Sequence, residues 1–262
     1  MQRSAVLWGG LLILFGGLLL LSRLGILVFN IWSVFWPLAL VLFGLSILFG
    51  GRSKSKPVAE QPTPEHVVME LKGAETADVH FKFGTGSLAV NGATPPDELM
   101  SGSFSGGVQY DARDLGSDKV ELTLQTPKES SWTRREWDVS LNPDIPLTLS
   151  FETGASENTL NLAGMQVSEL TLQSGAGHTE VTMPSAVTYT SVTIEGGAGL
   201  IELHIPDGVA ALIRGKTGVG SLDVDANRFP RVNNAYQSPD YETAPYKVEI
   251  QATVGAGRIV VQ

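Results

Sequence analysis

The segment from Leu170 to Pro206 contains one pattern twice, as LTLQSGAGHTEVTMP at 170–184 and VTIEGGAGLIELHIP at 192–206. Each copy has a stretch of alternating apolar and polar residues, a Gly-Ala-Gly motif and a second alternating stretch. Related motifs begin at Gly84, Gly154, Gly218 and Gly255, and several neighbours are about 21–22 residues apart, a period within the range of solenoid repeats. The chain is therefore expected to contain a repeat array of six copies.

The glycines of the six motifs are expected at sharp corners between strands. A positive φ or a close approach of two backbones at such a corner excludes larger residues. The predicted corner residues are Gly84, Gly86, Gly154, Gly175, Gly177, Gly197, Gly199, Gly218, Gly220, Gly255 and Gly257.

The flanking stretches repeat position by position. The fifth residue before the first glycine is apolar in every copy: Val79, Leu149, Leu170, Val192, Ile213 and Ile250. Alternation puts these side chains on one face of a strand and the polar ones on the other. One copy cannot bury its apolar face alone, whereas a stack can. The sequence predicts a mainly β fold, a single-layer stacked-strand β-solenoid over 66–262, with each strand beside its equivalent.

Two regions interrupt the period. Residues 99–141 contain three expected strands, around 102–111, 119–125 and 132–141, which form either an elongated coil or a sheet that caps the solenoid. Residues 226–245, with three prolines and Asn233-Asn234, are expected to form a long loop. Such a loop in a compact domain is more often functional than an ordinary connection.

Charge is unevenly distributed. The net charge is −9, but residues 1–56 contain five Lys/Arg and no Asp or Glu, so the remainder has 13 basic and 27 acidic residues, or −14. An acidic β domain argues against nucleic acid and anionic lipid as its partners, because both require a basic surface. The absence of cysteine excludes disulfides and cysteine-based metal sites.

The first 52 residues are expected to form a two-helix transmembrane hairpin, with helices at about 5–21 and 32–49. Gly9 and Gly16 lie seven residues apart on one side of the first helix, where small residues allow close helix packing, either within the hairpin or against a partner's membrane helices. Residues 53–65 are a Pro-rich linker. Lys and Arg flank both ends of the hairpin, so the positive-inside rule places both ends and the β domain in the cytoplasm.

Motifs of catalysis and metal binding are absent from the sequence. The histidines, His66, His80, His178 and His204, have no metal-ligand spacing, and there is no nucleophile elbow or phosphate loop. Stacking could bring His178 and His204 together on adjacent coils, although exposed strand positions are the favoured interpretation. We therefore expect no catalytic residues, no metal site, no cofactor and no enzymatic activity.

An acidic column is the most informative polar feature. The third residue after the motif is Glu180, Glu202 and Asp223 in three successive copies, and Asp225 could extend the series. Stacked strands lie about 4.8 Å apart, and like charges directly opposite one another are destabilising. One hypothesis is a stripe that faces a basic protein surface or a cation. The other is a solvated face whose charge keeps the domain soluble.

Several motifs resemble known families. Trp36-Pro37-Leu38 and Leu42-Phe43-Gly44-Leu45 resemble the LiaI/LiaF-type transmembrane region. The repeats, Trp137-Asp138-Val139-Ser140-Leu141, Ile145-Pro146-Leu147 and the closing segment 254–261 resemble the toast-rack β domains of LiaF-like and adhesin-like proteins. The resemblance implies a non-enzymatic bacterial plasma-membrane protein linked to cell-envelope stress signalling. In the best-known members it implies restraint of a sensor histidine kinase.

The leading hypothesis is therefore a membrane regulator whose β array contacts a membrane protein partner such as a sensor kinase. The alternative is a structural or adhesive solenoid that self-assembles or binds an envelope polymer. Homo-oligomers are compatible with both hypotheses. A β-helical enzyme that acts on polysaccharide is the least favoured class, because the only carboxylate arrangement is the acidic column.

Overall fold

The computed structural model describes residues 64–116, 118–127 and 135–262. The expected helices at 5–21 and 32–49, Gly9, Gly16 and linker residues 53–63 lie outside these ranges. Within the described ranges, no helix is long and apolar enough to cross a membrane. The chain divides into two compact units, Met1–Gln61 and Pro62–Gln262, and the fold described below is that of the second.

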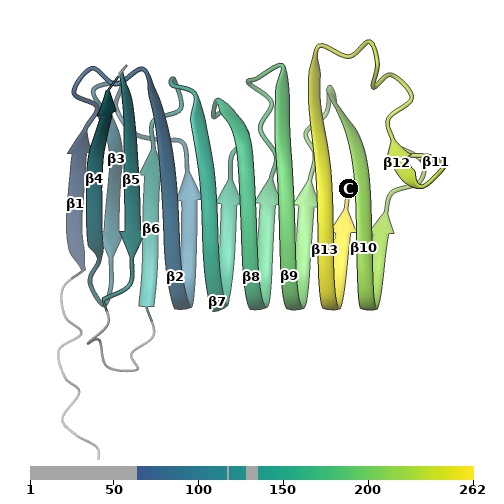
Figure 1. Cartoon of the computed structure of the whole chain (residues 1–262), viewed down its shortest axis with the longest axis horizontal. Helices are drawn as coiled ribbons and strands as arrows, with labels where there is room; N and C mark the ends of the chain where they lie inside the picture. Colours follow the sequence, from purple (N-terminus) through teal and green to yellow (C-terminus); the bar gives the residue numbers. More distant parts are fainter. Residues whose placement is uncertain (1–63, 117, 128–134) are drawn as a thin grey trace, which may run out of the picture. The chain divides into compact units, whose positions relative to one another are not determined.

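The described strands hydrogen-bond into one 13-stranded sheet (Figure 1). The strands are β1 (Glu65–Glu70), β2 (Thr76–Asn91), β3 (Glu98–Phe104), β4 (Gln109–Gly116), β5 (Lys119–Gln125), β6 (Arg135–Leu141), β7 (Leu147–Asn161), β8 (Val167–Thr182), β9 (Tyr189–His204), β10 (Val209–Val224), β11 (Arg231–Val232), β12 (Ala235–Gln237) and β13 (Tyr246–Val261).

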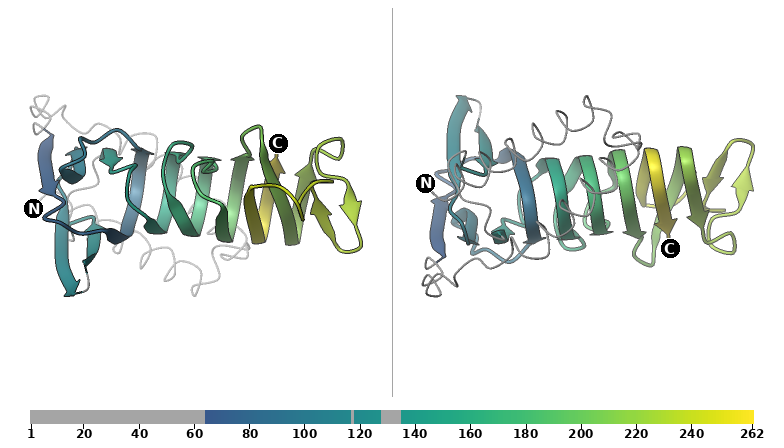
Figure 2. Two further views of the ribbon diagram at one scale, coloured as in Figure 1. Left: turned by 90° about the horizontal axis from the view of Figure 1, so that it is seen from above. Right: turned by 90° about the horizontal axis from the view of Figure 1, so that it is seen from below.

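Six long strands, β2, β7, β8, β9, β13 and β10, contain the repeat motifs near their middle and bend there (Figure 1). Their parallel register is maintained on both sides of the bend, so equivalent residues of neighbouring copies pair, as Val79 does with Leu149 and Leu149 with Leu170. The mainly β, stacked-strand prediction is confirmed. The sheet is not flat, however: bending folds it into two facing layers, and Figure 2 shows the long strands side by side.

The core lies between the two layers. The first layer is formed by the strand halves before the bend and the second by the halves after it. The apolar residues five positions before the motif are all buried, at 0–1% exposure. Because both layers direct their apolar sets inward, each copy closes the core of its neighbours.

The corner glycines all lie within the long strands, at or beside the bend. Gly177 and Gly199 have φ angles of 121° and 146°, which L-residues rarely adopt. A Cβ at Gly177 would lie 2.0 Å from the carbonyl oxygen of Ser156, and one at Gly199 would lie 2.1 Å from that of Gly177. Both the conformation and the close approach of adjacent backbones therefore require glycine here.

The spatial order of the strands departs from their order in the chain. β13, the last strand, lies between β9 and β10, and pairs with both over nearly its whole length. A size gradient in the first layer accompanies this order. In the sequence β2, β7, β8, β9, β13, β10, the third residue before the motif is Phe81, Phe151, Leu172, Ile194, Ala252 and Gly215.

The second layer compensates for this gradient. At the second residue after the motif, β8 has Thr179, whereas β9, β13 and β10 have Ile201, Ile259 and Leu222. At the β10 end the complementarity is tight, because a Cβ at Gly215 would lie 2.5 Å from a methyl carbon of Leu222. From β8 to β10 the second layer thus gains side-chain volume as the first layer loses it, which keeps the core filled.

At the opposite end the two layers separate. The first half of β2 pairs with β5, which pairs with β4, while the second half pairs with β6 and continues through β3 to β1. Aromatic side chains fill the wider core at this end. Trp137 packs against Phe83 and Phe104 with ring centroids 5.1 Å apart in both cases, and Phe81 stacks on Phe151 at 4.7 Å.

The strand predicted over 102–111 is wrong. The chain turns at Gly106 and Gly107, whose φ angles are 84° and 80°, so β3 ends at Phe104 and a separate β4 begins at Gln109. Two adjacent glycines favour such a turn because they adopt positive φ at little steric cost. β5 spans 119–125 as predicted, and the described part of β6 begins at Arg135.

The long connection at 226–245 is not simply a loop. It contains β11 and β12, and β12 pairs with Leu212 and Ile213 of β10. The chain thereby covers part of the end of the sheet before it returns to form β13.

A Gly177→Ala substitution tests the requirement for glycine at the bend. The added Cβ meets backbone rather than a side chain that can move, so we expect unfolding to become easier by about 3 kcal/mol or more. Gly164→Ala is the control, because a Cβ there has no heavy atom within 4 Å. Thermal or urea denaturation of the two variants measures the difference, and equal stabilities would contradict the explanation.

A polar pair interrupts the core between β7 and β8. Asn158 and Thr179 are 2% and 1% exposed, and the Asn158 side-chain amide donates to the Thr179 hydroxyl at 2.9 Å. The Asn158 carbonyl oxygen is buried and has no hydrogen-bond partner. A buried polar group without its partner costs about 1–3 kcal/mol.

Thr179→Val should therefore destabilise the protein by about 1–3 kcal/mol, since it leaves the Asn158 amide with only its long, 3.5 Å bond to the Thr153 hydroxyl. The double variant Asn158→Leu/Thr179→Val removes both partners and should recover most of this loss. Urea denaturation of the single and double variants checks the expectation. A double variant that loses the sum of the two single effects would show that the pair is not coupled.

Candidate interaction surface

The outer face of the second layer is strongly acidic. Its exposed or half-exposed carboxylates are Glu136 and Asp138 on β6, Glu157 on β7, Glu180 on β8, Glu202 on β9 and Asp223 on β10. We call this set the acidic face. Strand alternation accounts for its position, because each of these residues except Asp223 is next to a buried residue, and Asp223 lies between the half-buried Leu222 and Val224.

The outer face of the first layer has a different charge balance. Three of its carboxylates are paired with lysine or arginine: Asp78 with Lys119 at 2.8 Å, Glu152 with Lys82 at 3.8 Å, and Glu249 with Arg214. On the acidic face, Arg258 is the one such cation that forms an ion pair among the described residues. The second layer thus retains an excess of negative charge.

Glu180 and Glu202 lie directly opposite each other on β8 and β9, as the stacking of copies predicted. Each bonds to a histidine on the other strand: His178 Nε2 lies 2.8 Å from a Glu202 oxygen, and His204 Nε2 lies 3.2 Å from a Glu180 oxygen. These contacts partly offset the repulsion expected between facing carboxylates. The two histidines do not meet each other, because each contacts the carboxylate on the neighbouring strand.

Asp223 does not continue this column. β13 lies between β9 and β10, so Val260 separates Glu202 from Asp223, and the expected unbroken column is wrong. Asp223 also bonds to the guanidinium of Arg258 on β13. Insertion of β13 therefore spaces two like charges and supplies a cation to one of them.

Asp225 has a local structural role. Its N–H donates to the Val261 carbonyl at 3.0 Å, while its carbonyl accepts the Phe229 N–H at 2.8 Å and its carboxylate accepts the Asn227 N–H at 3.0 Å. It starts the turn that follows β10 and does not extend the column.

A hollow of about 520 Å³ lies on the acidic face between β6 and β7. Ser87 and Ala89 of β2 form part of its lining, together with the carboxylates of Glu136, Asp138 and Glu157. Sequence reasoning missed Glu136 and Asp138 because β6 lies outside the repeat, and it missed Glu157 because this residue directly follows its motif, two positions before the acidic column. That β6 lies beside β2 in the sheet became evident only from the pairing of these two strands in the structure.

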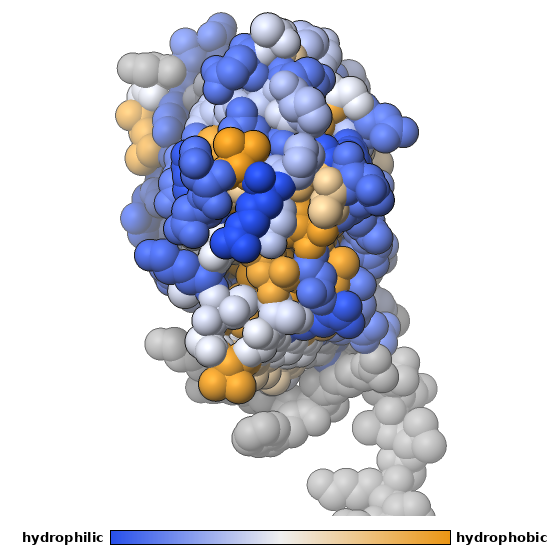
Figure 3. Space-filling view, turned by 90° about the vertical axis from the view of Figure 1, so that its right-hand side faces the viewer, coloured by the Kyte–Doolittle hydropathy of each residue, from blue (hydrophilic) through white to orange (hydrophobic). Residues whose placement is uncertain are grey.

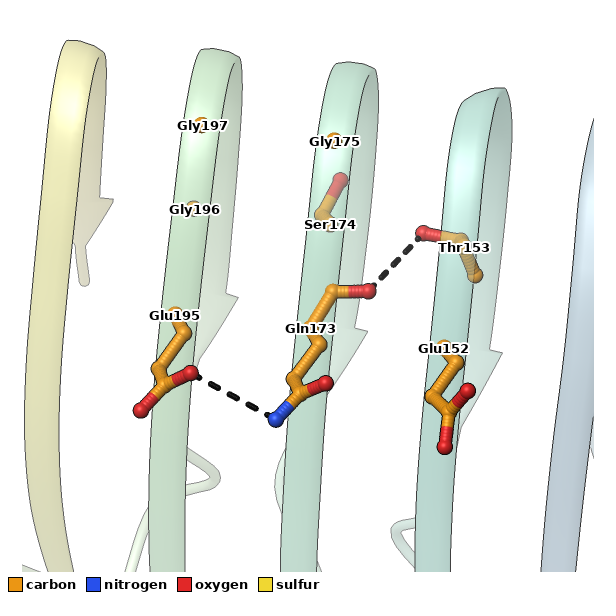
Figure 4. A pocket seen from close by; sticks show the side chains of 8 residues that line it. All are labelled: Glu152, Thr153, Gln173, Ser174, Gly175, Glu195, Gly196 and Gly197. Atoms are coloured by element: carbon orange, nitrogen blue, oxygen red, sulfur yellow. Dashed lines mark hydrogen bonds between the residues drawn. The ribbon is translucent and has the colours of Figure 1, made fainter.

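A second hollow, of about 490 Å³, lies on the outer face of the first layer, beside the bends of β7, β8 and β9 (Figure 4). Glu152, Gln173 and Glu195 project from adjacent strands, and the Gln173 amide donates to Glu195 at 3.4 Å. Ser174, Gly175, Gly196 and Gly197 leave space above this row. The hollow offers hydrogen-bonding groups rather than a catalytic arrangement.

Perturbed acid–base groups lie away from both hollows. Burial raises the pKa values of Tyr189 and Tyr241. The nearby Glu249 carboxylate raises both pKa values further. Across the described ranges, no group of three or more His, Asp or Glu side chains is arranged to hold a metal ion.

Comparison with known proteins assigns this architecture to a family. A model described as the N-terminal domain of toast_rack (DUF2154) matches residues 57–204, more than half of the chain. The chain belongs to the toast-rack family. A second model, the LiaI-LiaF-like transmembrane region, matches residues 6–48, so this toast-rack protein is an integral membrane protein. A search of curated proteins found no match.

One solved structure supports the fold of the toast-rack protein, and a second was also found. A candidate cell adhesion protein from Clostridium sporogenes ATCC 15579 is 25% identical, with a TM-score of 0.70 over 76% of this chain and 98% of its own. A candidate adhesin from Bacteroides fragilis NCTC 9343 is 11% identical, with a TM-score of 0.34 over 78% of this chain and 100% of its own.

Proposed function

We propose that this toast-rack protein is a non-enzymatic regulator in the bacterial plasma membrane that acts in cell-envelope stress signalling through protein–protein contacts. A two-helix hairpin at 1–52 would anchor it beside a membrane partner such as a sensor histidine kinase. The linker at 53–65 would connect this anchor to the β domain at 66–262. The combination of the two family matches supports this arrangement.

The acidic face is the observation that carries the proposal. The close-packed stack presents its carboxylates at fixed spacings, and few cations neutralise them. A surface of this kind favours a partner segment rich in lysine and arginine, because complementary charge accelerates association and excludes acidic partners. It also disfavours adsorption to anionic lipid headgroups, which leaves the face available for a protein.

Orientation is part of the proposal. Arg3 precedes the first hydrophobic segment, and Arg52, Lys54 and Lys56 follow the second, so both ends are expected in the cytoplasm. The β domain would then share a compartment with the catalytic region of a sensor kinase.

Neutralising the acidic face tests the regulatory role. In cells that lack the native protein, the variant Glu157→Gln/Glu180→Gln/Glu202→Gln should fail to restore normal output of the envelope-stress response and should cross-link to the kinase at least tenfold less. The matched control is Glu152→Gln/Glu169→Gln/Glu195→Gln, which removes the same charge from the first layer of the same three strands. Equal behaviour of both variants at equal abundance would contradict a specific role for the acidic face.

An adhesive or structural role is the second candidate. The candidate cell adhesion protein at TM-score 0.70 favours it, and so does the row of amide and carboxylate groups beside the bends of β7–β9, which could hydrogen-bond an envelope polymer. This role requires the β domain outside the cytoplasm, so the side of the membrane separates the two candidates.

The side of the membrane can be measured with Thr193→Cys in this otherwise cysteine-free chain. Thr193 is exposed on the outer face of the first layer, whereas its neighbour Ile194 is buried, so Ile194→Cys is the matched control for access. We expect a membrane-impermeant thiol reagent to label Thr193→Cys only after cell lysis. Labelling in intact cells would contradict the cytoplasmic orientation and favour the adhesive role.

A further inference from the structure

β10 has an incompletely paired outer edge. β12 pairs with Leu212 and Ile213, and Ala211 exchanges bonds with Ser238, each at 2.9 Å. Within the part of the chain that the structure describes, no strand pairs with the outer edge of β10 from Gly215 to Val224. Figure 3 faces this end of the sheet and shows apolar surface among the polar residues.

Side chains at this edge are less covered than their equivalents. Val219 at the bend is 79% exposed. Leu222 and Val224 are half-buried, whereas Ile259 and Val261, which occupy the same positions on β13, are buried. A long edge with free backbone groups and apolar side chains is a template for pairing with another strand.

Hydrogen-bond geometry identifies which backbone groups are free. The N–H and C=O groups of Ala211 point outward to Ser238. The direction of these backbone groups alternates from residue to residue along a strand, so the N–H and C=O groups of Gly215 and Thr217 point outward as well. After the bend, the Asp225 N–H points inward to Val261, so the outward groups belong to Leu222 and Val224. Two free positions thus lie on each side of the bend.

We propose that β10 pairs with β10 of a second copy of this chain, antiparallel and about a twofold axis at the bend. Gly215 would oppose Val224 of the second copy, and Thr217 would oppose Leu222. All four residues have outward backbone groups, and the bends of the two copies coincide. The first layer of each copy would continue into the second layer of the other, and the apolar edge would be buried.

Charge complementarity supports a second copy as the occupant. In this register Lys216 opposes Asp223 of the second copy, which already bonds to Arg258 of its own chain, and the twofold axis repeats this pair. A register moved by two residues in one direction would extend to Ile213, whose edge β12 already occupies. A register moved by two residues in the other direction would place Thr217 opposite Val224 and leave Gly215 without a partner. The proposed register is therefore the one that uses all four outward positions without the edge that β12 occupies, and it does not depend on any signalling or adhesive role.

Charge reversal with complementation tests the interface. The full chain in detergent micelles should sediment as a dimer, and Lys216→Asp or Asp223→Lys alone should weaken dimerisation about tenfold, because each places like charges opposite at two sites. A mixture of the two variants should form dimers again, since every pair is then complementary. Loss of stability in one variant would not produce this recovery.

Disulfide trapping tests the register. Lys216→Cys/Asp223→Cys should form covalent dimers under mild oxidation, because opposed residues of an antiparallel pair without ladder bonds lie about 4.5 Å apart. Lys216→Cys/Ser221→Cys should not form covalent dimers, because these two positions are opposite each other only in the register that β12 blocks at Ile213. Thr193→Cys is the control for dimers that form by random collision. Four outcomes would each overturn the proposal. The wild-type chain could be a monomer or form open-ended filaments, the dimer could be unaffected by both charge reversals, or trapping could be equal in all three cysteine variants.

Discussion

The structure depends on the close approach of neighbouring backbones at the bend. Adjacent copies stay in register on both sides of it, so each corner sits against the carbonyl groups of the next corner. At the last motif position, a Cβ would clash with the neighbouring backbone in five of the six copies, and β7, with Ser156, is the exception. Once the corners are aligned, the two halves of every strand face each other, and the alternating apolar residues must meet in a shared core.

A second consequence of this geometry is that the two layers must compensate for each other. The distance between the layers is set by the bends, so the first layer cannot lose volume unless the second gains it. From β8 to β10, the decrease from Leu172 to Gly215 and the opposing change from Thr179 to Leu222 show this compensation. The surface is organised by the same alternation, which directs the carboxylates of the second layer outward at fixed spacing and produces the acidic face.

Insertion of β13 between β9 and β10 connects the core to the surface. In the core it places Ala252 between Ile194 and Gly215. On the surface it places Val260 between Glu202 and Asp223 and brings Arg258 to Asp223. It also makes β10 the last long strand, whose edge β12 covers only in part. The position of one strand therefore determines the acid spacing and the edge that is open to a second copy.

The sequence by itself determined the long strands, their buried face and the positions of the corners, because alternation and glycine spacing are local properties of each copy. It also predicted that Glu180 and Glu202 would face each other. Only the tertiary structure decided the order of the last two copies, since strands with the same pattern can exchange places without changing any local preference. That order depends on side-chain volumes and charges in neighbouring copies. For the same reason, the contribution of Glu136 and Asp138 to the acidic face, and the separation of Asp223 from Glu202, could not be derived from the period.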